Sequence, residues 1–379
     1  MDSVAIPRRV RTLPGRILVL AFAVGALLLG ACSRQTVEPV PWTPTPSPVP
    51  TTAAGCGLQQ LPASWQLALK PTTMTPADQV DLLAHDATTG RSLYVRLGSP
   101  LTVVVADPGG AQRTLFELRG DEQPYGAAIE GDWAVLAVGG MNDLSVHAVY
   151  AKRVTGGDQV EVAAKAADGA VPLTSTPILY KGVAYVQVGA TGAGGETGLT
   201  AVDLATGQRT TWSVPRAMGE MARFGDLLVW RQGTGSAAAV DLRTQQIVDV
   251  PAPLSSVGDS TWVSSDGETV VWQGDSAGAG WLRACRSGWT SMREDALPGD
   301  ATSPSMTGWG RYAVVFMLDR FWIVDVETGQ YAPTTIEWGG ATVSGGLLAT
   351  AEMASEKGGS AGLRELDLTK VPTLPACTR

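Results

Sequence analysis

Residues 225–245 read GDLLVWRQGTGSAAAVDLRTQ and hold two short apolar segments, each beside a turn. In the first segment, Gly225-Asp226 precedes four apolar residues. In the second, an apolar run ends at Asp241 and is followed by Leu242-Arg243-Thr244-Gln245, which we interpret as a turn. Glycine supplies the positive φ that a tight hairpin needs, and an aspartate side chain can accept hydrogen bonds from the amides of a turn. Each run has the length of a strand and is too short for a stable helix. The stretch therefore predicts β-strands joined by hairpins.

Both units recur along the chain. The glycine unit begins at positions 36 to 51 residues apart, namely Gly131, Gly182, Gly225, Gly267, Gly310 and Gly346. The unit that ends in aspartate recurs at Asp203, Asp241 and Asp325, with a degenerate copy at Asp367. A period of about 40–45 residues containing four short strands is typical of propeller blades.

We therefore predict an all-β protein, a β-propeller of seven four-stranded blades, with six or eight blades as open alternatives. The first blade covers roughly 81–119, with Leu93–Leu97 and Leu101–Ala106 as its inner strands, and the others begin near 124, 173, 218, 258, 302 and 341. Trp65–Leu69 is predicted to complete the last blade, because an added strand removes an exposed sheet edge. Thr75–Val80 is the one helix-like stretch, with a threonine cap and a proline in the first turn.

Two segments carry a resemblance to known propellers. Residues 201–212 (AVDLATGQRTTW) resemble the repeat of quinoprotein-type propellers at Ala201, Asp203, Thr206 and Gly207, although Trp212 falls one residue late. Residues 264–272 (SSDGETVVW) resemble a hairpin of periplasmic translocation-type propellers. The resemblance implies a fold in which tryptophans clamp neighbouring blades. It implies no quinone, because most proteins with these repeats bind none. The best functional analogue is the class of propeller lipoproteins that act as scaffolds in envelope assembly.

The N-terminus has the pattern of an export signal. A basic segment precedes Ile17–Leu29, which is 13 residues without a polar side chain. Such a helix covers about 20 Å, short of the ~30 Å hydrocarbon core, so it indicates a signal peptide. Leu29-Gly30-Ala31-Cys32 resembles the bacterial lipobox, which implies cleavage between Ala31 and Cys32 and a lipid on Cys32. The pair Arg8-Arg9 leaves general and twin-arginine export both open.

The mature chain divides into a spacer and a folded domain. Residues 32–55 hold six prolines between Pro39 and Pro50, interleaved with threonine, serine and valine. Proline lacks an amide donor and fixes φ, so we predict an extended, disordered tether with neither helix nor sheet. The domains are therefore a signal peptide at 1–31, a tether at 32–55 and a propeller at 56–379.

Three cysteines remain once Cys32 carries a lipid. A propeller brings its termini together, and Cys56 and Cys377 lie near the two ends of the domain. Outside the cytoplasm we predict a Cys56–Cys377 disulfide, with Cys285 left as a buried thiol. A bond from Cys285 to one of the other two is the open alternative.

The residues that carry chemistry in other proteins have structural interpretations here. His85 and His147 are far apart and show no zinc-ligand spacing, so we predict no metal site. The repeated Asp203, Asp241 and Asp325 are predicted to cap turns, with calcium ligation or catalysis as the less favoured alternatives. The Gly-x-Ser-x-Gly match at 274–278 lacks a downstream histidine, so it is interpreted as a hairpin turn. We predict no catalytic residue and no cofactor.

The repeated strand units also contain tryptophans. Trp133, Trp230 and Trp272 recur at related positions and are predicted to lie in the core. A carbohydrate-stacking platform is the alternative interpretation.

Charge narrows the set of partners. The net charge is −8, and residues 1–31 hold four arginines and one acid, so the rest of the chain carries −11. A nucleic-acid binder needs a basic surface, so we do not expect a nucleic-acid partner.

Three function hypotheses remain. The first is a non-enzymatic, membrane-anchored binding or scaffold module, monomeric, on the outer face of the cytoplasmic membrane, with an envelope protein or glycan as partner. The second is an extracytoplasmic hydrolase or lyase acting on a carbohydrate or lactone through acids with raised pKa values in the channel. The third is a sensor for a signalling system.

Overall fold

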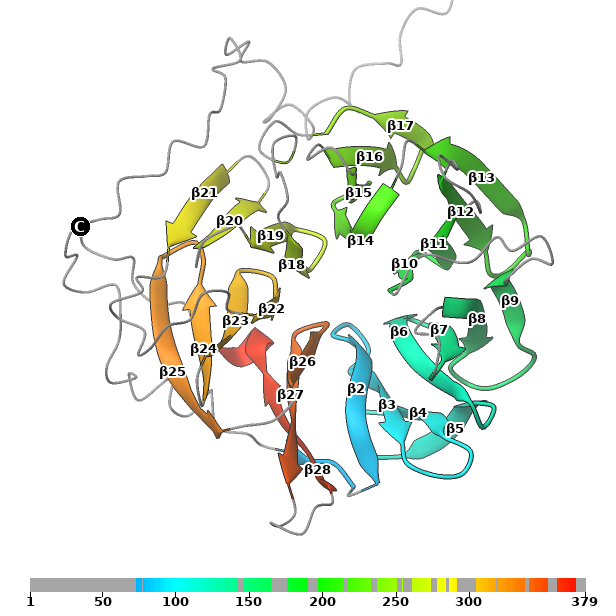
Figure 1. Ribbon diagram of the computed structural model, residues 1–379, viewed down its shortest axis with the longest axis horizontal. Coiled ribbons are helices and arrows are strands. Elements are labelled where there is room, and N and C mark those ends of the chain that lie inside the picture. The colour runs from blue at the N-terminus through cyan, green and yellow to red at the C-terminus, as the bar shows by residue number, and fades with distance from the viewer. Residues whose placement is uncertain are drawn as a thin grey trace, which may run out of the picture. The chain divides into compact units, whose positions relative to one another are not determined.

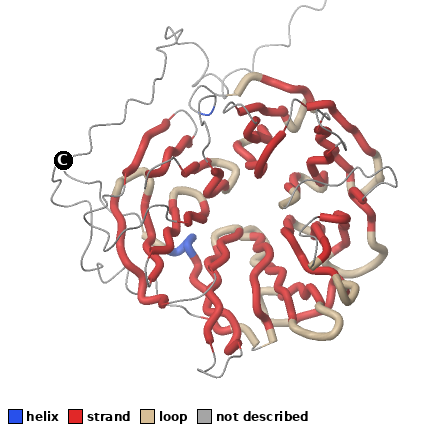
Figure 2. The backbone as a smooth tube through the Cα atoms, viewed as in Figure 1, coloured by secondary structure: helices blue, strands red, loops and turns tan. Residues whose placement is uncertain are grey.

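The computed structural model describes fifteen stretches of the chain and consists almost entirely of β-strands (Figures 1 and 2). The described residues are 73–76, 78–141, 146–164, 176–189, 197–214, 217–232, 237–250, 254, 261–273, 278–283, 286–291, 305–317, 320–337, 341–353 and 360–372. The predicted signal peptide and tether lie outside them.

Six of the sheets are each built from four consecutive antiparallel strands. The first contains β2 (Gln79–Asp86), β3 (Arg91–Arg96), β4 (Thr102–Ala106) and β5 (Gln112–Glu117); the second, β6 (Glu122–Glu130), β7 (Trp133–Gly140), β8 (Val146–Arg153) and β9 (Val160–Ala164); the third, β10 (Ile178–Tyr180), β11 (Val183–Gly189), β12 (Thr197–Asp203) and β13 (Arg209–Val214). The fourth contains β14 (Ala217–Phe224), β15 (Leu227–Gln232), β16 (Ala237–Asp241) and β17 (Gln246–Val248); the fifth, β18 (Thr261–Ser265), β19 (Thr269–Gln273), β20 (Gly278–Arg283) and β21 (Arg286–Ser291); the sixth, β22 (Ser305–Trp309), β23 (Tyr312–Met317), β24 (Arg320–Asp325) and β25 (Gln330–Glu337).

The seventh sheet joins the two ends of the described chain. It contains β26 (Ala341–Ser344), β27 (Leu347–Met353) and β28 (Ser360–Asp367), and its fourth strand is β1 (Thr73–Met74); a short helix, η2 (Leu368–Lys370), follows β28.

The sheets are arranged around an axis, as Figure 1 shows. The first strands of successive sheets contact one another in order, and β26 of the seventh sheet contacts β2 of the first. The all-β propeller prediction is confirmed. The two inner strands predicted for the first sheet, Leu93–Leu97 and Leu101–Ala106, correspond to β3 and β4, which lie between β2 and β5.

Ring closure uses an N-terminal strand, at a position different from the prediction. Thr73 pairs with Glu365 and Met74 with Arg364, and the Thr75 amide donates to the Leu363 carbonyl at 3.0 Å. The predicted closing strand, Trp65–Leu69, lies outside the described residues.

The helix predicted from Thr75 to Val80 was wrong. Gln79 and Val80 begin β2, and the Gln79 amide donates to the Pro76 carbonyl at 2.9 Å in a turn. A single turn of helix has little stability of its own. Pairing of β2 with β3 through six residue pairs supplies a ladder that a short helix could not match.

The core lies between neighbouring sheets. Trp230 is 1% exposed and packs against residues of the third sheet, and Trp272 is 2% exposed and packs against residues of the fourth. This confirms both as core residues that join adjacent blades. Trp133 is half-buried, and the guanidinium carbon of Arg153 lies 4.6 Å from its ring centroid.

The repeated aspartates cap turns, as predicted. Asp203 Oδ1 accepts from the amides of Ala205 (3.0 Å) and Thr206 (2.8 Å). Asp241 and Asp325 accept in the same way from the amides two and three residues later. The carboxylates therefore hold hairpins between the third and fourth strands of their sheets.

Among the described residues, no helix has the length and apolar character needed to cross a bilayer.

Candidate functional site

A cavity of about 480 Å³ lies at one end of the ring axis, and all seven sheets contribute to its wall. Its lining comes mainly from the ends of the first strands and the turns that follow them. Much of the wall is small, for example Ala84, Ala128, Ala222 and Gly308. Small side chains leave the axial space open, whereas larger residues at these positions would fill it.

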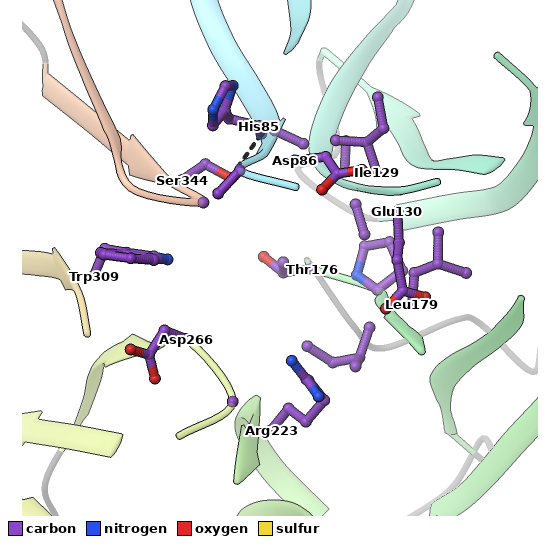
Figure 3. A pocket seen from close by; sticks show the side chains of 18 of the residues that line it. His85, Asp86, Ile129, Glu130, Thr176, Leu179, Arg223, Asp266, Trp309 and Ser344 are labelled. Atoms are coloured by element: carbon purple, nitrogen blue, oxygen red, sulfur yellow. Dashed lines mark hydrogen bonds between the residues drawn. The ribbon is translucent and has the colours of Figure 1, made fainter. Parts of the chain in front are cut away.

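Five ionisable side chains line this axial cavity: His85, Asp86, Glu130, Arg223 and Asp266. Figure 3 shows Asp86 and Glu130 on one side and Asp266 on the other. Three carboxylates and one guanidinium give a formal charge of −2 with histidine neutral.

Asp86 is the last residue of β2, and its carboxylate stabilises the fold through hydrogen bonds. Its carboxylate accepts from the Thr88 amide (2.9 Å), the Thr89 hydroxyl (2.8 Å) and the Gly131 amide of the next sheet (2.9 Å). Burial alone would raise the pKa of Asp86, but these hydrogen bonds outweigh it and lower the pKa. Asp86 is therefore a fixed negative charge that joins two blades.

Asp266 has a similar structural role in the fifth sheet. Its Oδ1 accepts from the amides of Glu268 (2.8 Å) and Thr269 (2.5 Å). A Cβ built on Gly310 would lie 2.7 Å from Asp266 Oδ2, and Gly310 has a φ of 55°. Glycine is therefore needed at position 310, both for its backbone conformation and for the close approach of the neighbouring turn.

Glu130 differs from the other two carboxylates. It is the last residue of β6, and its Oε2 atom is buried without a hydrogen-bond partner among the described residues. A buried polar atom without a partner is costly and is unusual in native proteins. Glu130 lines the axial cavity, while this oxygen atom itself is enclosed by protein.

Arg223 supplies the positive charge. Its guanidinium carbon lies 5.1 Å from the ring centroid of Tyr180, whose hydroxyl donates to the Asp226 carboxylate. The side chain also lies against Gly267, where a Cβ would overlap it. Arg223 is therefore positioned by the third and fifth sheets.

His85 is neutral at pH 7. Burial lowers its pKa, and the opposing charges of Asp367 and Asp86 do not compensate. Its Nδ1 lies 2.8 Å from Ser92 Oγ, and its backbone amide donates to Ser344 Oγ at 3.1 Å (Figure 3).

Trp309 provides an aromatic surface. It is half-buried, packs against the apolar cluster of the sixth and seventh sheets, and lines the axial cavity. Figure 3 shows its indole ring reaching into the cavity from the wall opposite Glu130.

The hydrolase hypothesis predicts converging acids with raised pKa values. Asp86 does not fit it, because its pKa is lowered and its oxygens are already hydrogen-bonded. The turn residues Asp203, Asp241 and Asp325 do not line the axial cavity. Within the described residues, no group of three or more His, Cys, Asp or Glu is placed to hold a metal ion.

Most of the sequence-predicted site residues lie where the structure gives no description: Ala31, Cys32, Cys56, Cys285, Cys377 and the segment 274–277. The lipidation and disulfide predictions therefore stay predictions. His147 lies in β8 and does not line the axial cavity.

Sequence reasoning missed the cavity residues, although a signal was available. Glu130, Asp266 and Trp309 each stand immediately before a repeated glycine, at Gly131, Gly267 and Gly310.

Comparison with known proteins finds likenesses among solved structures, all of them low in sequence identity. No family model matches the chain, and no match was found among curated proteins. Among solved structures, BamB from Moraxella catarrhalis is 16% identical with a TM-score of 0.43, covering 71% of this chain and 80% of that chain. The β-propeller domain of Cps50 (Swd1) from Myceliophteria thermophila is 11% identical with a TM-score of 0.49, and the match covers 78% of this chain and 98% of that chain. A complex of KlAtg21 with the coiled-coil of AgAtg16 is 9% identical with a TM-score of 0.46, and the match covers 73% of this chain and 95% of that chain.

Proposed function

We propose that this chain is a lipid-anchored, extracytoplasmic binding module whose propeller holds a partner from the cell envelope at the axial cavity. In this proposal Cys32 carries the lipid, residues 32–55 space the ring from the outer face of the cytoplasmic membrane, and the propeller acts as a scaffold without catalysis. Support for the anchor comes from the lipobox-like Leu29–Cys32 segment and the proline-rich segment after it.

The observation that carries the binding role is the axial cavity itself. It is open, formed by all seven sheets, and lined by fixed groups. Two of its three carboxylates, Asp86 and Asp266, accept hydrogen bonds from backbone amides, so they are held in place and give the site its charge. A rigid, charged cavity is suited to recognition.

Site-specific photo-crosslinking in cells tests the binding role. A photoreactive side chain replaces exposed Thr88 at the cavity rim or, in a separate variant, Leu97, which is 55% exposed at the other end of β3. We expect one discrete adduct from position 88 and none from position 97. Ala87→Trp narrows the cavity and should abolish the adduct, while Ala111→Trp, on an exposed turn elsewhere, should preserve it. Equal adducts from both positions, or insensitivity to Ala87→Trp, would refute the proposal.

Anchoring has its own test. Cys32→Ser should release the protein from the membrane fraction and abolish incorporation of a labelled fatty acid. Unchanged labelling would show that the lipid is not on Cys32.

A further inference from the structure

We propose that the axial cavity and a neighbouring cavity form one site for a neutral oligosaccharide of at least two sugar residues, one of which stacks on the Trp309 ring. The inference rests on the proposed function, because it names the ligand chemistry of the same site. The two sources of such a ligand are a free oligosaccharide and an internal segment of an envelope polysaccharide.

The neighbouring cavity, which we call the rim cavity, has a volume of about 490 Å³. Its wall comes from the fifth and sixth sheets and from η2. Asp266 and Trp309 line both cavities, so the two adjoin at these side chains. Each cavity alone lies within the ~300–1,000 Å³ typical of small-molecule sites. The pair therefore suits a chain of linked units better than one small molecule.

Trp309 has one ring face available where the two cavities adjoin. The other face is covered by the turn of the seventh sheet, because a Cβ built on Gly346 would lie 3.3 and 3.4 Å from Cδ2 and Cε2, the two atoms that the rings of the indole share. In Figure 3 the indole is seen edge-on, with Ser344 on one side and Asp266 on the other. The uncovered face is therefore the one on the side of Asp266.

An aromatic face beside a carboxylate matches the two kinds of surface on a sugar. The ring face carries partial negative charge, whereas the C–H groups on one side of a sugar ring carry partial positive charge and are apolar. The amides of Glu268 and Thr269 hold Oδ1 of Asp266 in place. A carboxylate has room for about four hydrogen bonds, so Asp266 can also accept from a sugar hydroxyl.

The charge of the rim cavity favours a neutral ligand. Its ionisable lining residues are two acids and two arginines, namely Asp266, Glu268, Arg283 and Arg311, and their formal charges cancel. Arg283 is held by Glu327 at 3.0 Å. Fixed guanidinium donors and carboxylate acceptors suit sugar hydroxyls, each of which both donates and accepts. The axial cavity adds a charge of −2, so an anionic sugar would be repelled.

Titration calorimetry on the full-length protein, in a detergent without a sugar head group, tests the inference. The neutral probes are maltose, cellobiose, mannobiose and N,N′-diacetylchitobiose, each compared with its own monosaccharide. Tetraethylene glycol serves as a neutral chain without sugar rings, and digalacturonate as an anionic disaccharide. We expect at least one neutral disaccharide to bind at least tenfold more tightly than its monosaccharide, because only the longer ligand reaches both cavities. Neither tetraethylene glycol nor digalacturonate should match it.

The methyl glycoside of the best disaccharide separates the two sources. A methyl group on the reducing end mimics the continuation of a chain, so unchanged affinity indicates an internal segment of a polysaccharide. Loss of affinity indicates a free oligosaccharide with its reducing end in the site.

Substitutions at Trp309 test the stacking contact. Trp309→Leu removes the aromatic face and should weaken binding of the best disaccharide at least tenfold. Trp309→Phe keeps an aromatic face and should retain most of the affinity. Trp309 also packs against the apolar cluster of the sixth and seventh sheets, so a second position is needed that does not touch this cluster.

Glu268 provides that position, because its side chain is 77% exposed and lines the rim cavity. Glu268→Trp narrows the rim cavity and should weaken binding of the disaccharide at least tenfold while leaving its monosaccharide unchanged. Glu268→Gln, the matched control, keeps the size of the side chain and should leave both affinities unchanged. Equal melting temperatures of the two variants would show that lost binding is not due to misfolding.

Three outcomes would overturn the inference: no neutral disaccharide binding more tightly than its monosaccharide, equal or tighter binding of tetraethylene glycol or digalacturonate, or unchanged disaccharide affinity in Trp309→Leu or Glu268→Trp. If the sugars fail while the Thr88 adduct is still lost in Ala87→Trp, the binding module stands and the ligand class is wrong. If the adduct is also absent, the proposed function fails as well.

Discussion

The contact between Tyr94 and Glu365 crosses the junction where the ring closes. Tyr94 lies in β3 of the first sheet and Glu365 in β28 of the seventh, and they are 4% and 7% exposed. The Tyr94 hydroxyl donates to Glu365 Oε1. Tyr94→Phe removes this donor and leaves a buried carboxylate oxygen without it. Hydrogen bonds to charged groups contribute ~1.5–3 kcal/mol, so we expect the free energy of unfolding to fall by about 2 kcal/mol at pH 7.5.

The loss depends on pH in a direction that the structure fixes. Burial raises the pKa of Glu365 above its usual value, and the bond from Tyr94 opposes this only in part. A raised pKa in the folded state means that the stability tied to protonated Glu365 is present below pH ~4.5 and is lost as pH rises through the folded pKa. The effect of Tyr94→Phe should therefore be larger at pH 7.5 than at pH 4.5, where a neutral carboxyl needs the donor less.

Urea unfolding followed by tryptophan fluorescence at both pH values measures this difference. Tyr150→Phe is the matched control, since it deletes the same atom from a half-buried tyrosine whose hydroxyl makes no hydrogen bond within the described part of the chain. The reasoning would be refuted if the two variants differed by less than ~0.5 kcal/mol at pH 7.5, or if the loss were greater at pH 4.5. Adding Glu365→Gln to Tyr94→Phe should recover part of the stability at pH 7.5.

Two further predictions concern packing and pH. A Cβ at Gly280 would overlap the ring of Trp272, which is 2% exposed, so Gly280→Ala should cost about 2 kcal/mol of stability. A Cβ at Gly198 would meet only ordinary contacts, the nearest at 3.5 Å, so Gly198→Ala should change the melting temperature by no more than a degree or two. If Gly280→Ala and Gly198→Ala lowered stability equally, the overlap at Gly280 would not be the cause of the loss. Burial lowers the pKa of His85, so the folded state resists its protonation, and stability should fall as pH drops below ~6.5, with a slope of at most about 1.4 kcal/mol per pH unit. Unfolding measured from pH 7.5 to 5 should show a flatter dependence in His85→Gln, and an unchanged slope would exclude His85 as the cause.

The strands and their order were predictable because the local chemistry of the turns repeats. Gly131 and Gly225 adopt φ values of 57° and 59°, which is the reason for a glycine at each of these turns. Asp203 and Asp241 accept from amides two and three residues later, so each aspartate marks the end of a strand. Such signals act within a few residues and can be recognised from sequence.

The stretch from Thr75 to Val80 shows where such local signals failed. Its threonine and proline are typical of a helix start, whereas Gln79 and Val80 begin β2, which pairs with β3. The axial cavity was not predictable for a related reason. Glu130 and Trp309 are 179 positions apart in the chain, and they line the same cavity only because the ring closes.

The two-residue strand β1 has a mechanical consequence. Everything N-terminal to Thr73, including the predicted attachment point at Cys32, connects to the ring through this strand. Force applied to the chain at Thr73 would act directly on the Thr73–Glu365 and Met74–Arg364 pairs and on the Thr75–Leu363 hydrogen bond. These few backbone contacts join β1 to the seventh sheet, so such a force would open the ring at its seam.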